Sequence, residues 1–323
     1  MVGVRMNLAD AVFRYWAKRG REETMRGYLG ISWLGNPCDR ALWYGFRWAT
    51  APQFEGRMYR LFNRGHREEE IVVQELRGVG LTVMEIDPDT GQQFAVVECE
   101  GHMRGHADGV VHGKGLDAVL EIKTHNDRSF KEVLKRGVKA TKPAHYVQMM
   151  VYARLLGLEQ SLYYAVNKNT DDVYSEAFEV DTLFADAQVA RGAAVIASDR
   201  PLAGISDTPT FHACKWCDHR KVCHEKHAPQ PTCRTCKHAR PDPGGEWHCG
   251  HWGNAIPKEY QFKGCAEHTY IEGLLPDGVA EKAREHGYGS GELYALKGAY
   301  HMIGEHTVEA LRAEFGAVVE EEK

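Results

Sequence analysis

The spacing of apolar positions changes along the chain between the period of a helix and the period of a strand. Residues 60–78 show helical spacing and predict one helix. Shorter apolar runs, bounded by glycine and polar residues, then predict strands. The candidate buried positions of the helix are Leu61, Ile71, Val72 and Leu76. The predicted strands cover 81–86, 93–98, 104–111 and 116–124.

The second half of the pattern predicts two helices, a hairpin and a further helix. Pro143 is a favoured first residue of a helix and opens the second of these helices. The predicted helices cover 127–136, 143–157 and 181–198, and the hairpin strands cover 161–169 and 172–180. Residues 1–60 read as helical and rich in aromatic residues, and a last helix is expected near 305–320.

The composition changes after Pro201, which suggests three parts. Residues 211–272 hold seven of the nine cysteines together with many prolines and glycines. We expect little regular helix or sheet there, because bound metal ions, rather than secondary structure, usually stabilise the fold of such a segment. The expected parts are 1–226, a cysteine-rich module over 227–272, and a linker with a C-terminal helix over 273–323.

The overall composition is that of a globular protein outside the membrane. Of 323 residues 43% are hydrophobic and 26% are charged, and the formal net charge of −5 leaves only local basic patches for a nucleic acid. No apolar run approaches a membrane span, and the first 20 residues are too charged for a signal peptide. We therefore expect a cytoplasmic protein whose cysteines bind metal rather than form disulfides.

One stretch, "GHADGVVHGKGLDAVLEIKT" at 105–124, places charges inside a strand pattern. Glu121 and Lys123 are two residues apart, so they share one face of a strand, and a hairpin can bring Asp108 beside them. Two neighbouring carboxylates repel unless a hard cation such as Mg²⁺ or Mn²⁺ lies between them. A lysine there can orient water and stabilise charge on a phosphate, which suits phosphodiester hydrolysis. The alternative is an exposed strand end without chemistry.

Two helices carry further candidates for this site. Glu69 and His66 lie in "GHREEE", and either can add a metal ligand, although a solvated charged face also explains that run. Gln148 and Tyr152 stand four residues apart on one helical face. They can contact a phosphate or the lysine, and ordinary half-buried packing is the alternative.

The order of these motifs resembles the PD-(D/E)xK nuclease superfamily, and within it the RecB-like nucleases. The resemblance covers about residues 30–225 and implies an α/β, restriction-endonuclease-like core with a mixed sheet flanked by helices. It implies that Asp108 and Glu121 hold the metal with the carbonyl of Ile122, and that Lys123 is the catalytic lysine. It also assigns Gln148 and Tyr152 to the RecB-type helix motif. Asp108 follows "HA" rather than the usual proline.

The cysteines fall into two groups of four. The layout of the first group resembles the iron–sulfur nucleases of the RecB-like group, including the CRISPR-adaptation exonucleases, and implies a structural [4Fe–4S] cluster. The second has the spacing of a Zn²⁺ site and resembles extensions of phage-type nucleases. The first group is Cys38, Cys214, Cys217 and Cys223. The second is Cys233, Cys236, Cys249 and Cys265, for one of which His248, His251 or His268 can substitute.

A rival grouping of the cysteines is open from the sequence. Cys214, Cys217, Cys233 and Cys236 form the regular C-x2-C-x15-C-x2-C spacing of a zinc ribbon. It leaves four cysteines without a site, whereas the first grouping leaves only Cys99, expected in a strand. We therefore favour the first grouping.

The motifs together predict a metal-dependent DNA nuclease. The resemblance implies an exonuclease of recombination, repair or phage replication, with DNA as substrate and a recombination, helicase or CRISPR-type protein as a further partner. The alternative is a module that binds DNA or protein on a nuclease-like fold without cleaving. An iron–sulfur carrier explains the cysteines but leaves Asp108, Glu121 and Lys123 without a role.

Overall fold

The computed structural model describes residues 7–22, 25–51, 54–225, 227, 229–265 and 267–274, and the backbone of 293–296 and 299–302. The expected helix near 305–320 and most of the part 273–323 lie outside these residues. The two last described segments pair as the antiparallel strands β12 (Leu293–Leu296) and β13 (Ala299–Met302). Among the described residues, no helix combines the length and the apolar character needed to cross a membrane.

A five-stranded mixed sheet forms the centre of the fold, in the order β2-β5-β6-β7-β8. The β6–β7 pair is parallel and the other pairs are antiparallel, so the expected mixed α/β architecture is confirmed. The strands are β2 (Thr82–Met84), β5 (Gly109–Gly113), β6 (Leu116–His125), β7 (Gln160–Asn167) and β8 (Val173–Glu179). Lys114 and Gly115 both have positive φ in the tight turn between β5 and β6.

The single strand predicted over 104–111 was wrong, because the chain leaves the strand conformation at Ala107 and Asp108. Residues before the break form β4 (Met103–His106), which joins β1 (Leu29–Gly30) and β3 (Ala95–Glu98) in a separate three-stranded sheet. Residues after it form β5 in the central sheet. Asp108 therefore lies where the chain passes from one sheet to the other.

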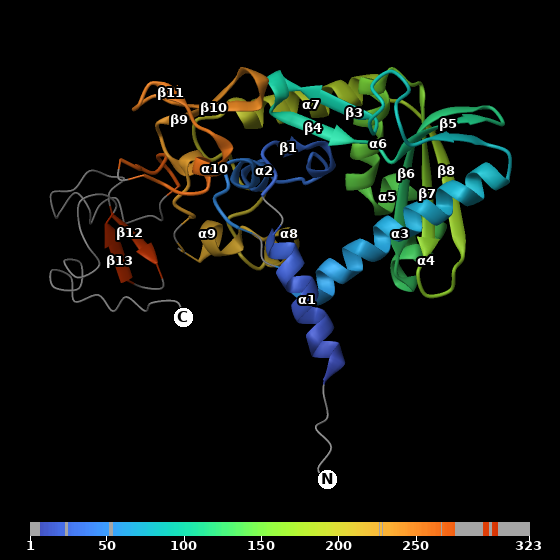
Figure 1. The fold of residues 1–323 in the computed structure, drawn as a ribbon, viewed down its shortest axis with the longest axis horizontal. Coiled ribbons are helices and arrows are strands. Elements are labelled where there is room, and N and C mark those ends of the chain that lie inside the picture. Colours follow the sequence, from blue (N-terminus) through green and yellow to red (C-terminus); the bar gives the residue numbers. More distant parts are fainter. Residues whose placement is uncertain are drawn as a thin grey trace, which may run out of the picture.

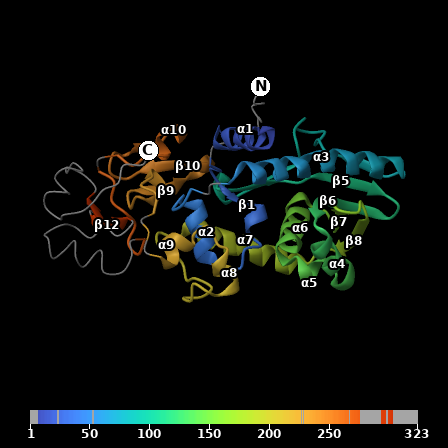
Figure 2. The ribbon, with the colours of Figure 1, turned by 90° about the horizontal axis from the view of Figure 1, so that it is seen from below.

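Helices cover both faces of the central sheet, as Figure 2 shows. The long helix α3 (Gly56–Gly78) lies on one face, and α4 (Asp127–Arg136), α5 (Val138–Thr141) and α6 (Pro143–Leu156) lie on the other. Local signals set their ends: Asn126 accepts a hydrogen bond from Ser129 N at the start of α4, and Pro143 opens α6. Helix α7 (Thr182–Ala197) packs on α6, and α1 (Leu8–Glu22) packs on α3.

Helix α3 contacts the sheet through a narrower stripe than its sequence pattern indicates. Val72, Val73 and Leu76 are buried against β5, β6 and β7. Ile71, a predicted buried position, is 49% exposed, because it lies about 100° around the helix from Val72 and away from Val73 and Leu76. The expectation for Ile71 was wrong, and Val73 takes its place in the core.

The cysteine-rich region contains regular structure, against expectation. A three-stranded antiparallel sheet in the order β11-β10-β9 packs beside α2 (Asp39–Phe46), at the left of Figure 1. Trp247 of β10 is fully buried and stacks obliquely on Phe46 of α2. The elements of the region are α8 (His212–Lys215), α9 (Arg220–His224), a 3₁₀ turn at Cys233–Thr235, β9 (Ala239–Asp242), a 3₁₀ turn at Pro243–Gly245, β10 (Glu246–Cys249), β11 (Asn254–Ala255) and α10 (Lys258–Gln261).

A buried arginine joins this region to the N-terminal part of the chain. The Arg234 guanidinium lies 3.8 Å from the ring centroid of Trp48, and its side chain is 2% exposed. It donates to the carbonyls of Phe46 at 3.2 Å and Gly27 at 2.9 Å, and to Gln261 at 3.0 Å. The apolar side chains of both parts belong to one core cluster.

Candidate active site

Asp108 is held at the break between β4 and β5 by the neighbouring strand. Its Oδ2 accepts a hydrogen bond of 2.8 Å from the backbone N–H of Ile122 on β6. The register of the β5–β6 hairpin pairs Gly109 with Leu120, which places Asp108 beside Glu121 and Ile122. The hairpin expected from the sequence therefore brings the two acidic residues together.

Glu121 is a carboxylate at 1% exposure in the middle of β6. Gln148 of α6 donates to its Oε2 at 2.8 Å, and Lys123 forms an ion pair with its Oε1. Burial raises the pKa of Glu121 to about 7, with Lys123 acting against the shift and Asp108 adding to it. A carboxylate in this position gains from any further positive charge that binds beside it.

Lys123 lies on the same face of β6 as Glu121 and is partly open to solvent, with 29% of its side chain exposed. Besides the ion pair, its Nζ donates to the carbonyl of Ile122 at 3.2 Å. Burial acts to lower the pKa of Lys123, but the carboxylates of Glu121, Asp108 and Glu69 outweigh it and raise the pKa. The side chain is therefore an ammonium at neutral pH, suited to stabilising negative charge rather than to taking a proton.

The structure separates the two candidates on the first long helix. Glu69 on α3 is half-buried, and burial together with Asp108 raises its pKa. It also contributes to the shifts of Glu121 and Lys123, so its carboxylate lies within electrostatic range of the same centre. His66 is exposed and acts to lower the pKa of Glu69. Of the two, Glu69 is the half-buried residue, and it interacts electrostatically with Asp108 and Lys123.

Gln148 points from α6 toward Glu121 on β6, and Tyr152 points from α6 toward β4. Both side chains are buried. Burial, followed by Glu121 and Asp108, raises the pKa of Tyr152. Its ring and hydroxyl lie directly against Gly105 on β4, where any side chain would overlap them. The sequence did not indicate a role for Gly105. The glycine before "HAD" belongs to the quoted motif, but its contact with a residue on α6 depends on the tertiary fold.

A second polar group, also missed, extends the site toward the end of β6. The Tyr163 hydroxyl on β7 lies 2.7 Å from Nε2 of His125 and 2.9 Å from Nδ1 of His145. Burial lowers the pKa of His125 to about 4 and that of His145 to about 3, with Lys123 adding to both shifts. Tyr163 pairs in register with Glu121, so a polar track runs along β6 from Glu121 through Lys123 to His125.

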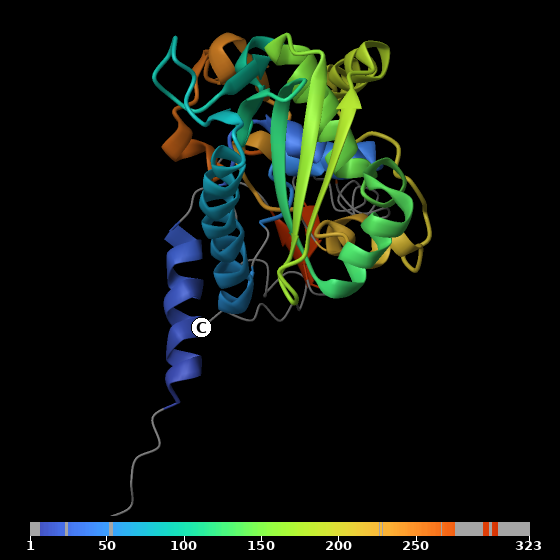
Figure 3. The ribbon, with the colours of Figure 1, turned by 90° about the vertical axis from the view of Figure 1, so that its right-hand side faces the viewer.

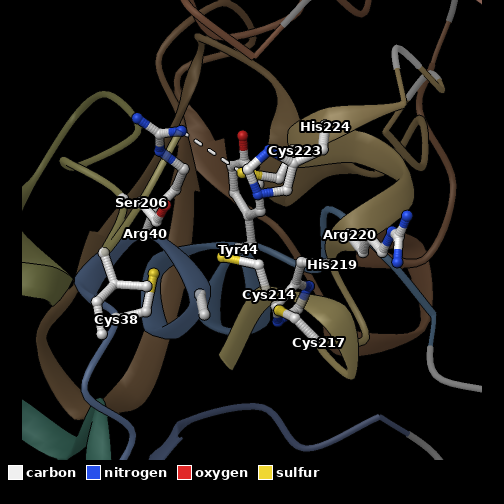
Figure 4. Close-up of a pocket in the computed structure, with 13 residues that line it drawn as sticks. Cys38, Arg40, Tyr44, Ser206, Cys214, Cys217, His219, Arg220, Cys223 and His224 are labelled. Atoms are coloured by element: carbon white, nitrogen blue, oxygen red, sulfur yellow. Dashed lines mark hydrogen bonds between the residues drawn. The ribbon is translucent and has the colours of Figure 1, made fainter. Parts of the chain in front are cut away.

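The first four cysteines line one hollow between α2, α8 and α9. Figure 4 shows them around Tyr44 and Arg40, whose Nη1 lies 3.5 Å from Cys223 Sγ. Burial raises the pKa of Cys214, and the neighbouring sulfurs of Cys38 and Cys223 add to it. The four residues are Cys38, Cys214, Cys217 and Cys223. Arg191 fixes the loop before Cys38 by donating to Leu34 O, Asn36 O and Asp39 Oδ1.

The other four cysteines line a second hollow, formed by the three-stranded sheet and α10. Burial raises the pKa of Cys233 to about 11, and Cys265, Cys236 and Cys249 add to the shift in that order. The same hollow is lined by His251 and His268 and by His238, which the sequence reasoning did not consider. His248 is not among its lining residues. The lining cysteines are Cys233, Cys236, Cys249 and Cys265.

The zinc-ribbon grouping is not brought together by the fold. Cys214 and Cys217 line the first hollow, whereas Cys233 and Cys236 line the second. Cys99 belongs to neither hollow and lies in a 3₁₀ turn with positive φ rather than in the expected strand. Over the described ranges, no three His, Cys, Asp or Glu side chains converge closely enough to hold a metal ion directly.

Comparisons with known proteins give structural likenesses only. No protein-family model matches the chain, and no curated protein matches its sequence. A solved structure described as SSO0001 aligns with 15% identity and a TM-score of 0.39, over 68% of this chain and 98% of that one. The alkaline exonuclease LHK-Exo from Laribacter hongkongensis aligns with 17% identity and a TM-score of 0.38, over 58% of this chain and 91% of that one.

A further structure, of LHK-Exo in complex with dAMP, aligns with 16% identity and a TM-score of 0.39, over 58% of this chain and 91% of that one. Identities and TM-scores this low assign no function to the chain.

Proposed function

We propose that the chain is a metal-dependent nuclease that hydrolyses the phosphodiester bonds of DNA. The observation that carries the proposal is the environment of Glu121, whose carboxylate is 1% exposed. One of its oxygens accepts a hydrogen bond from Gln148, and the other forms an ion pair with Lys123. Burying the Glu121 carboxylate costs desolvation energy, and strongly perturbed carboxyl groups of this kind gather at functional sites. Asp108, joined to the same strand through Ile122 N–H, supplies the second carboxylate.

The donor set fits Mg²⁺ or Mn²⁺. Asp108, Glu121 and the carbonyl of Ile122 are hard oxygen donors on adjacent backbone positions, and Glu69 faces them from α3. When bound, such a cation would polarise a phosphoryl oxygen and lower the pKa of a water molecule. Two residues of the chain would assist the reaction. Gln148 fixes the rotamer of Glu121, and the Lys123 ammonium stabilises the charge that develops on the phosphate.

The two cysteine groups support this site as scaffolds. Cys38 and the trio Cys214, Cys217 and Cys223 offer four thiolates, which fits a [4Fe–4S] cluster, and the Arg40 guanidinium beside Cys223 offsets negative charge. The set of Cys233, Cys236, Cys249 and Cys265 fits structural Zn²⁺. Iron and zinc analysis of anaerobically purified protein tests both. A colourless protein with two zinc ions would contradict the cluster.

The experiment that tests the nuclease uses end-labelled linear DNA, single- and double-stranded, and a covalently closed circle, each with Mn²⁺. Asp108→Asn, Glu121→Gln and Lys123→Ala should abolish cleavage while leaving the thermal unfolding curve cooperative. Asp117→Asn is the matched control, because Asp117 is an exposed carboxylate on the same strand with a side chain 68% exposed. Cleavage by Lys123→Ala at the wild-type rate would refute the assignment.

The substrates also separate the finer alternatives. Loss of the end label without cutting of the circle supports the proposed exonuclease, and cutting of the circle shows internal cleavage. Binding without cleavage of any substrate supports the non-cleaving module. A recombination, helicase or CRISPR-type partner stays a prediction from the sequence.

A further inference from the structure

Three cations surround the end of β6, beyond the carboxylate centre. Arg64 belongs to α3, Lys142 to the junction of α5 and α6, and Lys168 to the turn after β7. Figure 3 shows the first half of α3 at the same end of the sheet as the turn between β7 and β8. The three residues therefore come from three separate elements that meet near the end of β6.

Two hydrogen bonds tie Arg64 and Lys168 to the end of β6. Arg64 Nη2 donates to the carbonyl of Lys168 at 2.9 Å, and the N–H of Lys168 donates to the carbonyl of His125 at 2.9 Å. Lys142 and Lys168, with Lys123, help lower the pKa of His125, after the larger effect of burial. Lys142 and Lys168 consequently lie near the last residue of β6, at the end of the polar track, and Arg64 is joined to them through the Lys168 carbonyl.

The three cations have no acidic partner in the part of the chain that the structure describes. The ion pairs there involve other residues, and Asp127, the nearest acidic residue on α4, is occupied by Lys131 and Asn167. Like charges gathered at one place repel each other. An anion bound among them removes that repulsion.

We propose that Arg64, Lys142 and Lys168 bind a backbone phosphate of the substrate strand next to the phosphate that is cleaved. This proposal rests on the proposed nuclease function, since Lys123 of that site stands two residues before His125. At a rise of about 3.3 Å per strand residue, this is a separation of about 7 Å along β6. A phosphate one or two nucleotides from the cleaved bond lies within that reach, because a DNA strand advances about 3.4 Å per nucleotide.

The test measures DNA binding as a function of salt in the Asp108→Asn background, where binding is separate from cleavage. The probe is a fluorescent single-stranded oligonucleotide. Removal of one phosphate contact should reduce the slope of log affinity against log salt by about 0.7. We expect Lys142→Ala/Lys168→Ala to lose about this amount and to raise KM in the otherwise wild-type enzyme.

Lys135→Ala/Lys258→Ala is the matched control, because it removes the same charge from exposed positions of α4 and α10 that form none of the described ion pairs. Equal slopes for the two double variants would overturn the subsite. If the wild-type protein binds the oligonucleotide but cleaves nothing, a lower slope for Lys142→Ala/Lys168→Ala alone still supports the subsite while the nuclease proposal fails.

A further comparison identifies the phosphate. Equal loss of slope on circular and linear strands assigns the subsite to an internal phosphate. Loss confined to linear strands that carry a 5′-phosphate assigns it to the terminal one. Absence of any DNA binding by the wild-type protein would overturn both the subsite and the nuclease.

Discussion

Gly105 lies against the ring of Tyr152, and one added methyl group tests how the site is packed. A Cβ at this position would lie 2.8 and 2.9 Å from two ring carbons and closer still to the hydroxyl. Ordinary carbon–carbon contacts lie at about 3.5–4.0 Å, so the ring must retreat by about 1 Å. The φ of Gly105 is not positive, so alanine fits the backbone and the overlap alone decides the outcome.

We expect Gly105→Ala to destabilise the protein by about 1–3 kcal/mol, the usual cost of overpacking. At about 2.1 cal/mol/K of unfolding entropy per residue, a chain of 323 residues loses about 1.5 °C of Tm per kcal/mol. A shift of about 1 Å in a site can reduce the rate about 100-fold, so cleavage should fall more steeply than stability. Thermal unfolding and Mn²⁺-dependent cleavage measure the two effects.

Two companion variants make the experiment decisive. Gly65→Ala lies within α3 with no atom near its added Cβ, and it should be neutral or stabilising by about 0.5–1 kcal/mol. Tyr152→Phe in the Gly105→Ala background removes the closest overlapping atom and should recover part of the lost stability. If Gly105→Ala unfolds and cleaves like the wild type, the described contact with Tyr152 is wrong.

Three further results are expected. Gln148→Ala removes a hydrogen-bond donor to the charged form of Glu121, so the pKa of Glu121 should rise above about 7. The pH–rate profile with Mn²⁺ should then move to higher pH, and the affinity for the metal should be about 10–100-fold weaker. Burial lowers the pKa of His125 and His268 to about 4, so the unfolded chain binds more protons than the folded protein between pH 6.5 and 4. The urea midpoint of unfolding should therefore fall as the pH is lowered through this window, and a midpoint independent of pH would contradict the burial of these histidines. Arg234→Lys loses the planar fork that serves Gln261 and two carbonyls, and its Tm should fall clearly, whereas an unchanged Tm refutes the role of this arginine.

Local spacing was sufficient to predict the parts of the site that lie on one element. Glu121 and Lys123 share a strand face because of the two-residue period, and Gln148 and Tyr152 share a helix face because of the four-residue spacing. The turn with Lys114 and Gly115 then made the pairing with Asp108 foreseeable.

Other features depend on contacts between distant segments. The burial of Glu69 and the exposure of His66 depend on the rotation of α3 against the sheet, which a run of charged residues does not encode. The strands of the cysteine-rich region are short, and Trp247 stabilises them by packing on Phe46 from α2 rather than through its own propensity. Tyr163 became part of the site only through its register with Glu121.

The buried Arg234 has a consequence for synthesis on the ribosome. Its acceptors, the carbonyls of Phe46 and Gly27, precede it by 188 and 207 residues. At about 5–20 residues per second, those carbonyls wait about 10–40 s before their partner is made. The N-terminal part therefore cannot complete its packing until Arg234 has been synthesised, and a chaperone that shields Trp48 during that interval would raise the yield of folded protein.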